Sequence, residues 1–371
     1  MKSLPVVAFS LFIMFFSISA IAQDSSAHKS AEVTEATSHE KSKEGEFDVT
    51  STILEHISDN YYWHTFGHHA FPLPVILHTD KGFEVFSSEH LINEEHEPVI
   101  YNGNYPYKII EKDNTVSIAV VDASGKVDEE ATGKILDISI TKNVTSMFIT
   151  VAILLVMFLS VAKAYKKRGV TSAPKGFQSF MEPLILFVRD EIAKPYLGHQ
   201  YKKYMPFLLS VFFFIWVNNL LGLIPFFPGG ANVSGNIGFT LALALFTFVI
   251  VNINGNKDYW GHIFWMPGLP VPMKIFLMPI EFLGVFIKPI SLMIRLFANI
   301  TAGHILVLSL ICLIFIFKSI AASAMAVPFA MFINAIELLV AFLQAFIFTM
   351  LSALYIGMAI EEHHHHDEAH A

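Results

Sequence analysis

The sequence predicts an all-α integral membrane protein preceded by a small β-containing exported region. Its membrane part is expected to hold an upright helix, an interfacial helix, two spans and a long tilted helical hairpin. Two observations carry this prediction. The 371 residues are 54% hydrophobic and only 15% charged, a balance that is rare among soluble domains of this length. Long apolar runs fill most of the chain after residue 141, whereas short strand-like stretches separated by Gly/Asp turns precede them.

Charge and cysteine content exclude some classes of partner and bond. The net charge is −8 and the chain has no large basic block, so we expect no nucleic acid partner. Cys312 is the single cysteine, so an internal disulfide is excluded. Because it lies in an apolar run, we expect this thiol to act as a small packed hydrophobe.

The N-terminal 22 residues resemble a secretory signal. Lys2 precedes an apolar core, and Ala20-Ile21-Ala22 offers an A-x-A cleavage site. The alternative is a retained first transmembrane helix. The sequence therefore predicts three parts: a signal peptide at 1–22, an exported periplasmic extension at 23–140 that begins with a polar linker, and a membrane domain at 141–371.

Four helical elements are expected at the start of the membrane domain. Residues 144–162 are long enough to span, and the basic "KAYKKRG" after them marks the cytoplasmic side. Residues 174–200 are too polar to span and suit an interfacial helix. Two further spans follow at 204–226 and 237–254, joined by an outer turn, "PGGANVSGN".

The interfacial helix is expected to be amphipathic. Apolar residues at helical spacing lie on one predicted face and polar residues on the other. The apolar face holds Phe177, Phe180, Leu184, Phe187 and Val188, and the polar face holds Gln178, Glu182 and Arg189.

The last two apolar runs, at about 273–317 and 327–360, are longer than a membrane is thick. As helices they would measure about 65 Å and 50 Å, against a hydrocarbon core of about 30 Å. Pro279 and Pro289 permit kinks in the first run, but no turn signal divides either one. We therefore expect two long, tilted helices joined through "KSIAASAMAV", with the C-terminus cytoplasmic.

Arg295 is the most informative residue of the first long run. An arginine in the middle of a membrane costs about 3 to 17 kcal/mol, so it is expected to meet water, an acid or an ion pathway. The alternative is an internal ion pair that serves folding. With about 100° of rotation per residue, one helix face collects six residues. They are Glu281, Lys288, Ser291, Arg295, Asn299 and Ala302. His304 falls on the opposite face.

The last run carries a polar face of its own. It holds Asn334, Glu337, Gln344, Ser352 and Tyr355. Such a face indicates a hydrated path, and the alternative for its amides and hydroxyl is hydrogen bonding between helices. An unpaired buried carboxylate is unfavourable, so we expect Glu337 to find a partner. His304 is the predicted partner, because histidine exchanges protons near neutral pH.

Three motifs resemble one family. "RLFANITAGH", "LVAFLQAFIFTMLSALYIGMAIEEH" and "NLLGLIPFF" are similar to subunit a of the F-type ATP synthase, over about 144–363. The resemblance implies a non-catalytic stator subunit of the Fo sector that carries protons past a rotating ring and needs no cofactor. It implies as partners the c-ring, the subunit b stalk and the F1 sector, in a bacterial inner membrane.

The resemblance also assigns roles. Arg295 matches the essential ion-transfer arginine. Asn219, Asn299 and Gln344 match polar neighbours of the path, and Glu281 and Ser291 match its cytoplasmic half. Many relatives have a glutamate and a histidine where this chain has His304 and Glu337, so the two residue types are exchanged. Some relatives carry an acid at the position of Gly222. In this family the choice between H⁺ and Na⁺ rests largely on the ring.

Two other functions compete with this interpretation. A secondary cation/proton transporter also uses charged residues within the membrane, but it usually shows internal repeats, and none is visible here. An exported metal-binding protein is suggested by His64, His68 and His69 in "WHTFGHH". No cysteine accompanies these histidines, and their spacing matches no strong zinc pattern.

Overall fold

The computed structural model describes residues 53, 57–64, 70–93, 98–112, 115–122, 124–169, 173–224, 228–266, 268–317 and 320–361. The predicted signal segment, the linker and the tail after Glu361 lie outside these residues. Two compact units make up the chain. The first comprises Met1–Ala152, Val217–Phe239 and Phe297–Ala341, and the second Ile153–Trp216, Thr240–Leu296 and Phe342–Ala371. Several long helices contribute residues to both.

The extension in the first unit is built from short antiparallel strands. They are β1 Tyr62–His64, β2 Ala70–Pro72, β3 Pro74–Thr79, β4 Gly82–Ser87, β5 Tyr101–Asn102, β6 Pro106–Lys112, β7 Thr115–Val120 and β8 Leu136–Asp137, with η1 Ser88–Leu91 and α3 Glu129–Thr132. Their sheets have the orders β1-β2, β4-β3-β8 and β5-β6-β7. Val75, Leu77, Leu91 and Tyr107 are fully buried in their common core. The predicted strands of the extension are therefore confirmed.

Helices make up most of the described chain after residue 141. They are α4 Lys142–Arg168, α5 Phe177–Phe187, η2 Val188–Ala193, α6 Lys194–Leu197, η3 Gly198–Gln200, α7 Tyr201–Leu223, η4 Val233–Gly235, α8 Ile237–Asn254, α9 Lys257–Phe264, α10 Val271–Phe317 and α11 Ile320–Ile360. Five stretches of the described residues are long and apolar enough to cross a membrane. The protein is therefore a multi-pass membrane protein.

The amphipathic pattern predicted for residues 174–200 is only partly correct. Phe187 packs against aromatic rings of α7 and α11, and Val188 is fully buried. Phe177 and Phe180 are instead exposed, and Gln178 is 3% exposed. The cause lies in the preceding helix, because the Tyr165 phenol is hydrogen-bonded to Gln178 and Glu182. The polar face of α5 is thus turned partly inward.

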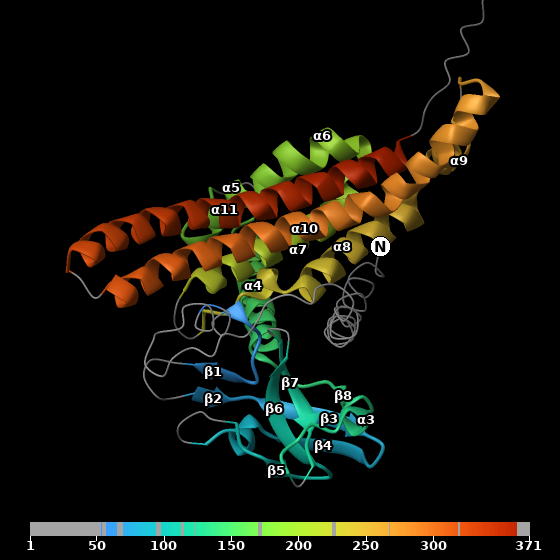
Figure 1. The fold of residues 1–371 in the computed structure, drawn as a ribbon. Coiled ribbons are helices and arrows are strands. Elements are labelled where there is room, and N and C mark those ends of the chain that lie inside the picture. The colour runs from blue at the N-terminus through green and yellow to red at the C-terminus, as the bar shows by residue number, and fades with distance from the viewer. Residues whose placement is uncertain are drawn as a thin grey trace, which may run out of the picture. The chain divides into compact units, whose positions relative to one another are not determined.

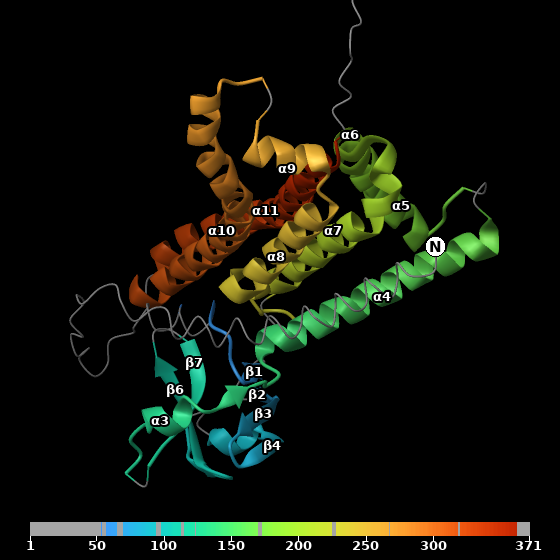
Figure 2. The same cartoon turned by 90° about the vertical axis from the view of Figure 1, so that its right-hand side faces the viewer.

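The two long C-terminal runs each form one continuous helix, as the lack of a turn signal predicts. The expected ten-residue turn between them is wrong, because α11 begins at Ile320 and Pro328 lies inside it. Only positions 318 and 319 separate the helices, and they lie outside the described residues. α10 and α11 run alongside each other in antiparallel directions (Figures 1 and 2). Within the second unit, α9 lies next to the first turns of α10, where Phe264 contacts Phe282 (Figure 2).

Candidate functional site

The predicted site residues come from three helices. Asn219 lies on α7, and Glu337 and Gln344 lie on α11. α10 supplies the others, which are Glu281, Ser291, Arg295, Asn299 and His304. Asn219 and Gln344 are buried, Arg295 and Asn299 are exposed, and the remaining four are half-buried. The protein therefore encloses part of the predicted path and leaves another part open at its surface.

Arg295 lies on an exposed part of α10. Ile294 directly before it is 51% exposed, and Ala298 and Asn299, about one turn further, are exposed as well. Among the described residues no carboxylate forms an ion pair with Arg295. An electrostatic interaction does link it to Tyr355 of α11. The described part of the chain thus gives no support to the alternative of a folding ion pair.

Asn219 is the centre of a buried hydrogen-bonded cluster in the first unit. The hydroxyl of Ser234, in the turn η4, donates a 2.6 Å hydrogen bond to Asn219 Oδ1. Asn219 Nδ2 donates to the carbonyl of Ala341 on α11, at 3.3 Å. Next to it, Asn218 Oδ1 accepts a 3.0 Å hydrogen bond from Thr150 of α4. Three helices and a loop are therefore joined by amide and hydroxyl groups at this position.

His304 and Glu337 lie in the same unit on facing helices. The Glu337 carboxylate fills the space that a side chain at Gly303 would need. His304 Nε2 points toward α7 and lies 3.6 Å from the position of a Cβ added at Gly222. The absence of a side chain at Gly222 thus leaves room for His304, and its absence at Gly303 leaves room for Glu337. The direct pairing of His304 with Glu337 stays a prediction.

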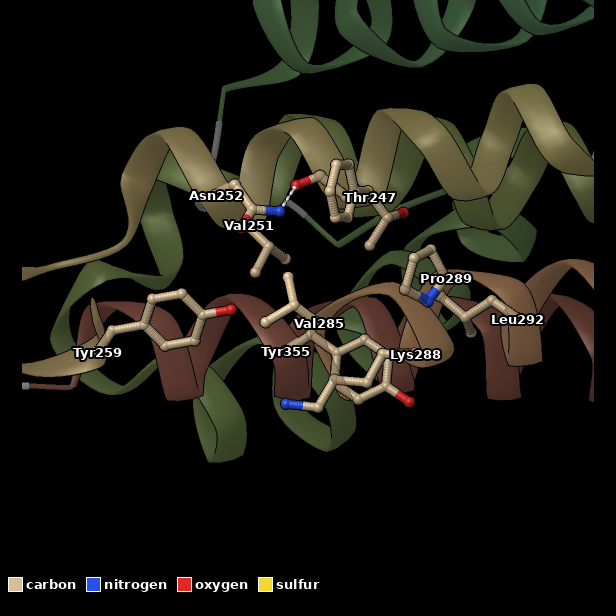
Figure 3. Close-up of a pocket in the computed structure, with 10 residues that line it drawn as sticks. Thr247, Val251, Asn252, Tyr259, Val285, Lys288, Pro289, Leu292 and Tyr355 are labelled. Carbon is tan, nitrogen blue, oxygen red and sulfur yellow. Dashed lines mark hydrogen bonds between the residues drawn. The ribbon is translucent and has the colours of Figure 1, made fainter. Parts of the chain in front are cut away.

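A small cavity of about 10 Å³ lies in the second unit (Figure 3). Side chains of α8, α9, α10 and α11 line it, and Tyr259, Lys288 and Tyr355 are the residues with ionisable groups. The Lys288 ammonium lies 5.6 Å from the centre of the Tyr355 ring, a cation–π distance. Lys288 precedes Arg295 by seven residues, about two turns of α10, so the two cationic side chains share one face of this helix.

The residues on the polar face of α11 differ in their burial and in their contacts. Ser352 is buried and lies 3.2 Å from the Thr247 hydroxyl of α8, which supports the alternative of hydrogen bonding between helices for this residue. Gln344 is 4% exposed, whereas Asn334 is exposed. A single hydrated face is therefore too simple a description, because only part of it is turned inward.

The histidines of the extension give no metal centre among the described residues. His64 lies in β1, but His68 and His69 fall outside the part of the chain that the structure describes. Within the described residues, no group of three or more His, Cys, Asp or Glu side chains is placed to hold a metal ion.

Comparison with known proteins decides the family. The ATP synthase A chain family matches residues 144–357, more than half of the chain. The chain belongs to the ATP synthase subunit a family. The ATP synthase subunit a of Chloroherpeton thalassium is 48% identical over 237 residues, which cover 63% of this chain and 70% of the relative. That of Chlorobium phaeobacteroides (strain DSM 266) is 50% identical, over 62% and 68% of the two chains.

A more distant relative also matches this chain, and the extension matches a family of its own. The ATP synthase subunit a of Anaeromyxobacter sp. is 40% identical, over 68% of this chain and 64% of the relative. Residues 52–138 match a separate family, described as a domain of unknown function (DUF8433). As an ATP synthase subunit a, the protein is a component of the Fo sector of a larger complex.

Several polar residues of the cluster around Asn219 escaped the sequence analysis. Thr150, Asn218 and Ser234 are all at most 2% exposed. A signal for one of them was present, because Asn143, Ser146 and Thr150 recur at helical spacing within an otherwise apolar span. Ser234 gave no such signal, since a serine in a Gly/Asn-rich turn is ordinarily attributed to the turn itself.

Proposed function

We propose that this subunit provides two offset half-channels for protons and holds Arg295 between them, next to the c-ring. The observation that carries the proposal is the position of Arg295. It is a permanent positive charge on an exposed face whose neighbours, Ile294 and Ala298, are apolar or small. A charge on such a face suits a partner that brings its own carboxylate into the membrane.

The proposed outer half-channel passes Asn219, His304, Glu337 and Gln344. From there a proton neutralises a carboxylate on a passing c-subunit, which can then move into lipid. The burial of the Asn219 cluster and the position of Glu337 beside Gly303 support this route. Histidine and glutamate are groups that accept and release protons, so they suit a relay.

The proposed exit toward the cytoplasm passes Glu281 and Ser291, both half-buried on α10. Arg295 separates the two routes, with Asn299 as its polar neighbour. An opposite charge within about 4–6 Å lowers the pKa of a carboxyl group, so the guanidinium favours proton loss from the ring carboxylate. Its charge also repels a proton that would otherwise pass directly between the half-channels.

The same proposal includes the protein partners of the subunit and its orientation in the membrane. The c-ring, the subunit b stalk and, through the complex, the F1 sector are the protein partners. The subunit is a non-catalytic part of the complex and needs no cofactor of its own. Residues 1–22 would direct export, residues 23–140 would lie in the periplasm, and residues 141–371 would sit in the inner membrane. The basic residues after α4 support a cytoplasmic end for that helix.

Replacement of Arg295 by alanine tests the proposal. We expect Arg295→Ala to abolish ATP-driven proton uptake by inverted membrane vesicles, because no fixed charge then acts on the ring carboxylate. Lys274→Ala is the matched control, since it removes a positive charge from the same helix and should leave uptake intact. Normal uptake with Arg295→Ala, in vesicles that contain the assembled complex, would overturn the proposal.

A further inference from the structure

The first two turns of α4 carry a buried polar stripe that the proposed half-channels do not use. Asn143, Ser146 and Thr150 follow each other at spacings of three and four residues, so they share one helix face. They are 6%, 0% and 0% exposed. Among the described residues, no group donates to or accepts from the Ser146 hydroxyl. At its inner end the stripe reaches Asn218, which accepts from Thr150 and precedes Asn219.

At its outer end the stripe opens into a cavity of about 20 Å³. Its polar lining comes from Asp59, Asn143 and Asn236, and its apolar lining from α4, the outer turn and α8. The buried Asn143 Oδ1 atom has no hydrogen-bond partner among the described residues. A cavity of this size accommodates one water molecule when two or more polar groups face it. The site is therefore suited to a bound water.

Asp59 is the ionisable group of this cavity, and it belongs to the extension. Its carboxylate accepts hydrogen bonds from the Thr141 hydroxyl at 2.7 Å and from the Asn143 and Asn60 amides at 3.0 Å each. Burial raises its pKa, while these hydrogen bonds and the Lys142 ammonium act in the opposite direction.

Titratable groups of the extension lie near Asp59. Tyr61 lies close enough to interact with it electrostatically, and the Tyr61 phenol donates to Asp137 at 2.6 Å. The Lys142 ammonium, at the start of α4, also interacts with Asp59 electrostatically. The Asp59 carboxylate is thus positioned by hydrogen bonds, and neighbouring charged groups influence its pKa.

Two contacts fasten this part of the extension to the membrane domain. The buried Trp63 indole donates a 3.0 Å hydrogen bond to the carbonyl of Gly229, in the outer turn. The backbone amide of Lys142, at the start of α4, donates to the Asn60 carbonyl at 2.8 Å. Asp59 directly precedes Asn60 and lies four residues before Trp63 in the sequence. Its hydrogen-bond partners Thr141 and Asn143 belong to the membrane domain, so the membrane domain and the extension build its surroundings together.

We propose that Asp59 is a proton-relaying residue at the outer mouth of the ion path, followed by a hydrated route along Asn143, Ser146 and Thr150 to Asn219. The carboxylate takes a proton from outside water and becomes a neutral carboxylic acid. It then gives that proton to the water in the cavity and returns to its charged form. This inference rests on the proposed function, because it extends the proposed outer half-channel into the extension.

The first test measures ATP synthesis by the reconstituted holoenzyme when protons enter from the outer side. We expect Asp59→Asn to lower the rate roughly tenfold or more, since the amide cannot exchange a proton. Its Oδ1 atom can still accept from the two backbone amides, so the local fold should persist. Asp59→Glu restores a carboxyl group and should recover most of the rate, which a purely structural role would not predict. A wild-type rate with Asp59→Asn overturns the inference.

A second test follows water access and does not need Asp59 to be changed. Ser146→Cys is placed in a Cys312→Ala background, with Leu155→Cys, 58% exposed on the same helix, as the control. Thiols react as thiolates, which form only where water reaches them. We expect Ag⁺ added outside to inhibit synthesis by the Ser146→Cys complex and not by the control. Full resistance of Ser146→Cys to Ag⁺ overturns the hydrated route.

The two proposals fail in different ways. If Arg295→Ala abolishes proton transport while Asp59→Asn and Ser146→Cys behave as the unmodified complex, only the role of the extension is wrong. If the Arg295→Ala complex transports normally, the proposed half-channels themselves are wrong.

Discussion

The carboxylate of Glu337 occupies the space beside Gly303, immediately before His304 in the sequence. This arrangement brings an acid of α11 to the same turn of α10 that carries the histidine. In the relatives that the sequence resembles, the two residue types stand in the opposite order. The structure thus places both members of the exchanged pair at one level of the helical hairpin.

Gly303→Ala should disturb proton transport more than it disturbs folding. The added Cβ would collide with the end of the Glu337 side chain, which is flexible and can move away. We expect the complex to assemble and ATP-driven proton uptake to fall, because Glu337 loses its place in the path. Gly284→Ala, on the same helix, is the control, since no atom lies within 4 Å of its added Cβ. Unchanged uptake with Gly303→Ala would contradict a role for this position of Glu337.

His304 and Glu337 should be close enough to cross-link. With Cys312 replaced by alanine, the pair His304→Cys and Glu337→Cys is expected to form a disulfide in the assembled complex, seen as a mobility shift under non-reducing conditions. A disulfide requires Cα atoms within about 7 Å. Glu337→Cys combined with Ile305→Cys provides the control for chance collisions. A folded complex in which the first pair never cross-links would show that the pairing is wrong.

Gly357→Ala should destabilise the subunit itself. The added Cβ would collide with the backbone carbonyl of Tyr196 at the end of α6, and backbone cannot yield as a side chain does. Overpacking of this kind costs about 1–3 kcal/mol. The expected result is a lower temperature of thermal inactivation of the purified complex. Gly261→Ala, where no atom lies within 4 Å of the added Cβ, should leave that temperature unchanged.

Ser234→Ala should leave the Asn219 side chain less firmly positioned. The substitution removes the 2.6 Å hydrogen bond to Asn219 Oδ1 and leaves a buried acceptor without its donor, at a cost of about 1–3 kcal/mol. We expect slower proton-driven ATP synthesis and a lower thermal stability. Ser210→Ala is a suitable comparison, because that exposed hydroxyl donates only within its own helix, to the Pro206 carbonyl. Equal effects of the two substitutions would argue against a special role for the Asn219 cluster.

The stability of the extension should fall as the pH rises through the folded pKa of Asp59. Burial raises this pKa above its ordinary value of 3.8, so the folded state binds the proton more tightly than the unfolded state. The resulting stabilisation is complete below the ordinary pKa and is lost at higher pH. Asp59→Asn should abolish this dependence. Hydrogen exchange of residues 57–64 in the assembled complex, corrected for the intrinsic pH effect, would measure it. A pH dependence that persists unchanged in Asp59→Asn must come from another group.

Much of the fold follows from the periodicity of apolar residues. The long apolar runs predicted α4, α7, α8 and the continuous α10 and α11, because nothing in those runs ends a helix. The faces of α5 were harder to predict. In a membrane protein the apolar face can point outward, so Phe180 is exposed while Gln178 is buried against Tyr165.

Some residues of the candidate site could be predicted from the sequence, and others could not. Arg295 stood out because a charge within an apolar run has few explanations, and the spacing around it gave its helix face. Asp59 did not stand out, since it lies in a polar stretch where an aspartate is ordinary. Only the three-dimensional contacts with Thr141 and Asn143 make it a half-buried, hydrogen-bonded carboxylate, and contacts between distant segments leave no periodic trace in one sequence.

The hydrogen bond from Trp63 to Gly229 joins residues that are 166 positions apart, which sets an order for biogenesis. The indole is synthesised long before its acceptor exists. At roughly 5–20 residues per second, the ribosome needs on the order of ten seconds or more to reach the outer turn. During that interval the newly made extension lacks one of its anchors, so it is then most open to chaperones and proteases. A nascent chain arrested before Gly229 would be the state in which this vulnerability is greatest.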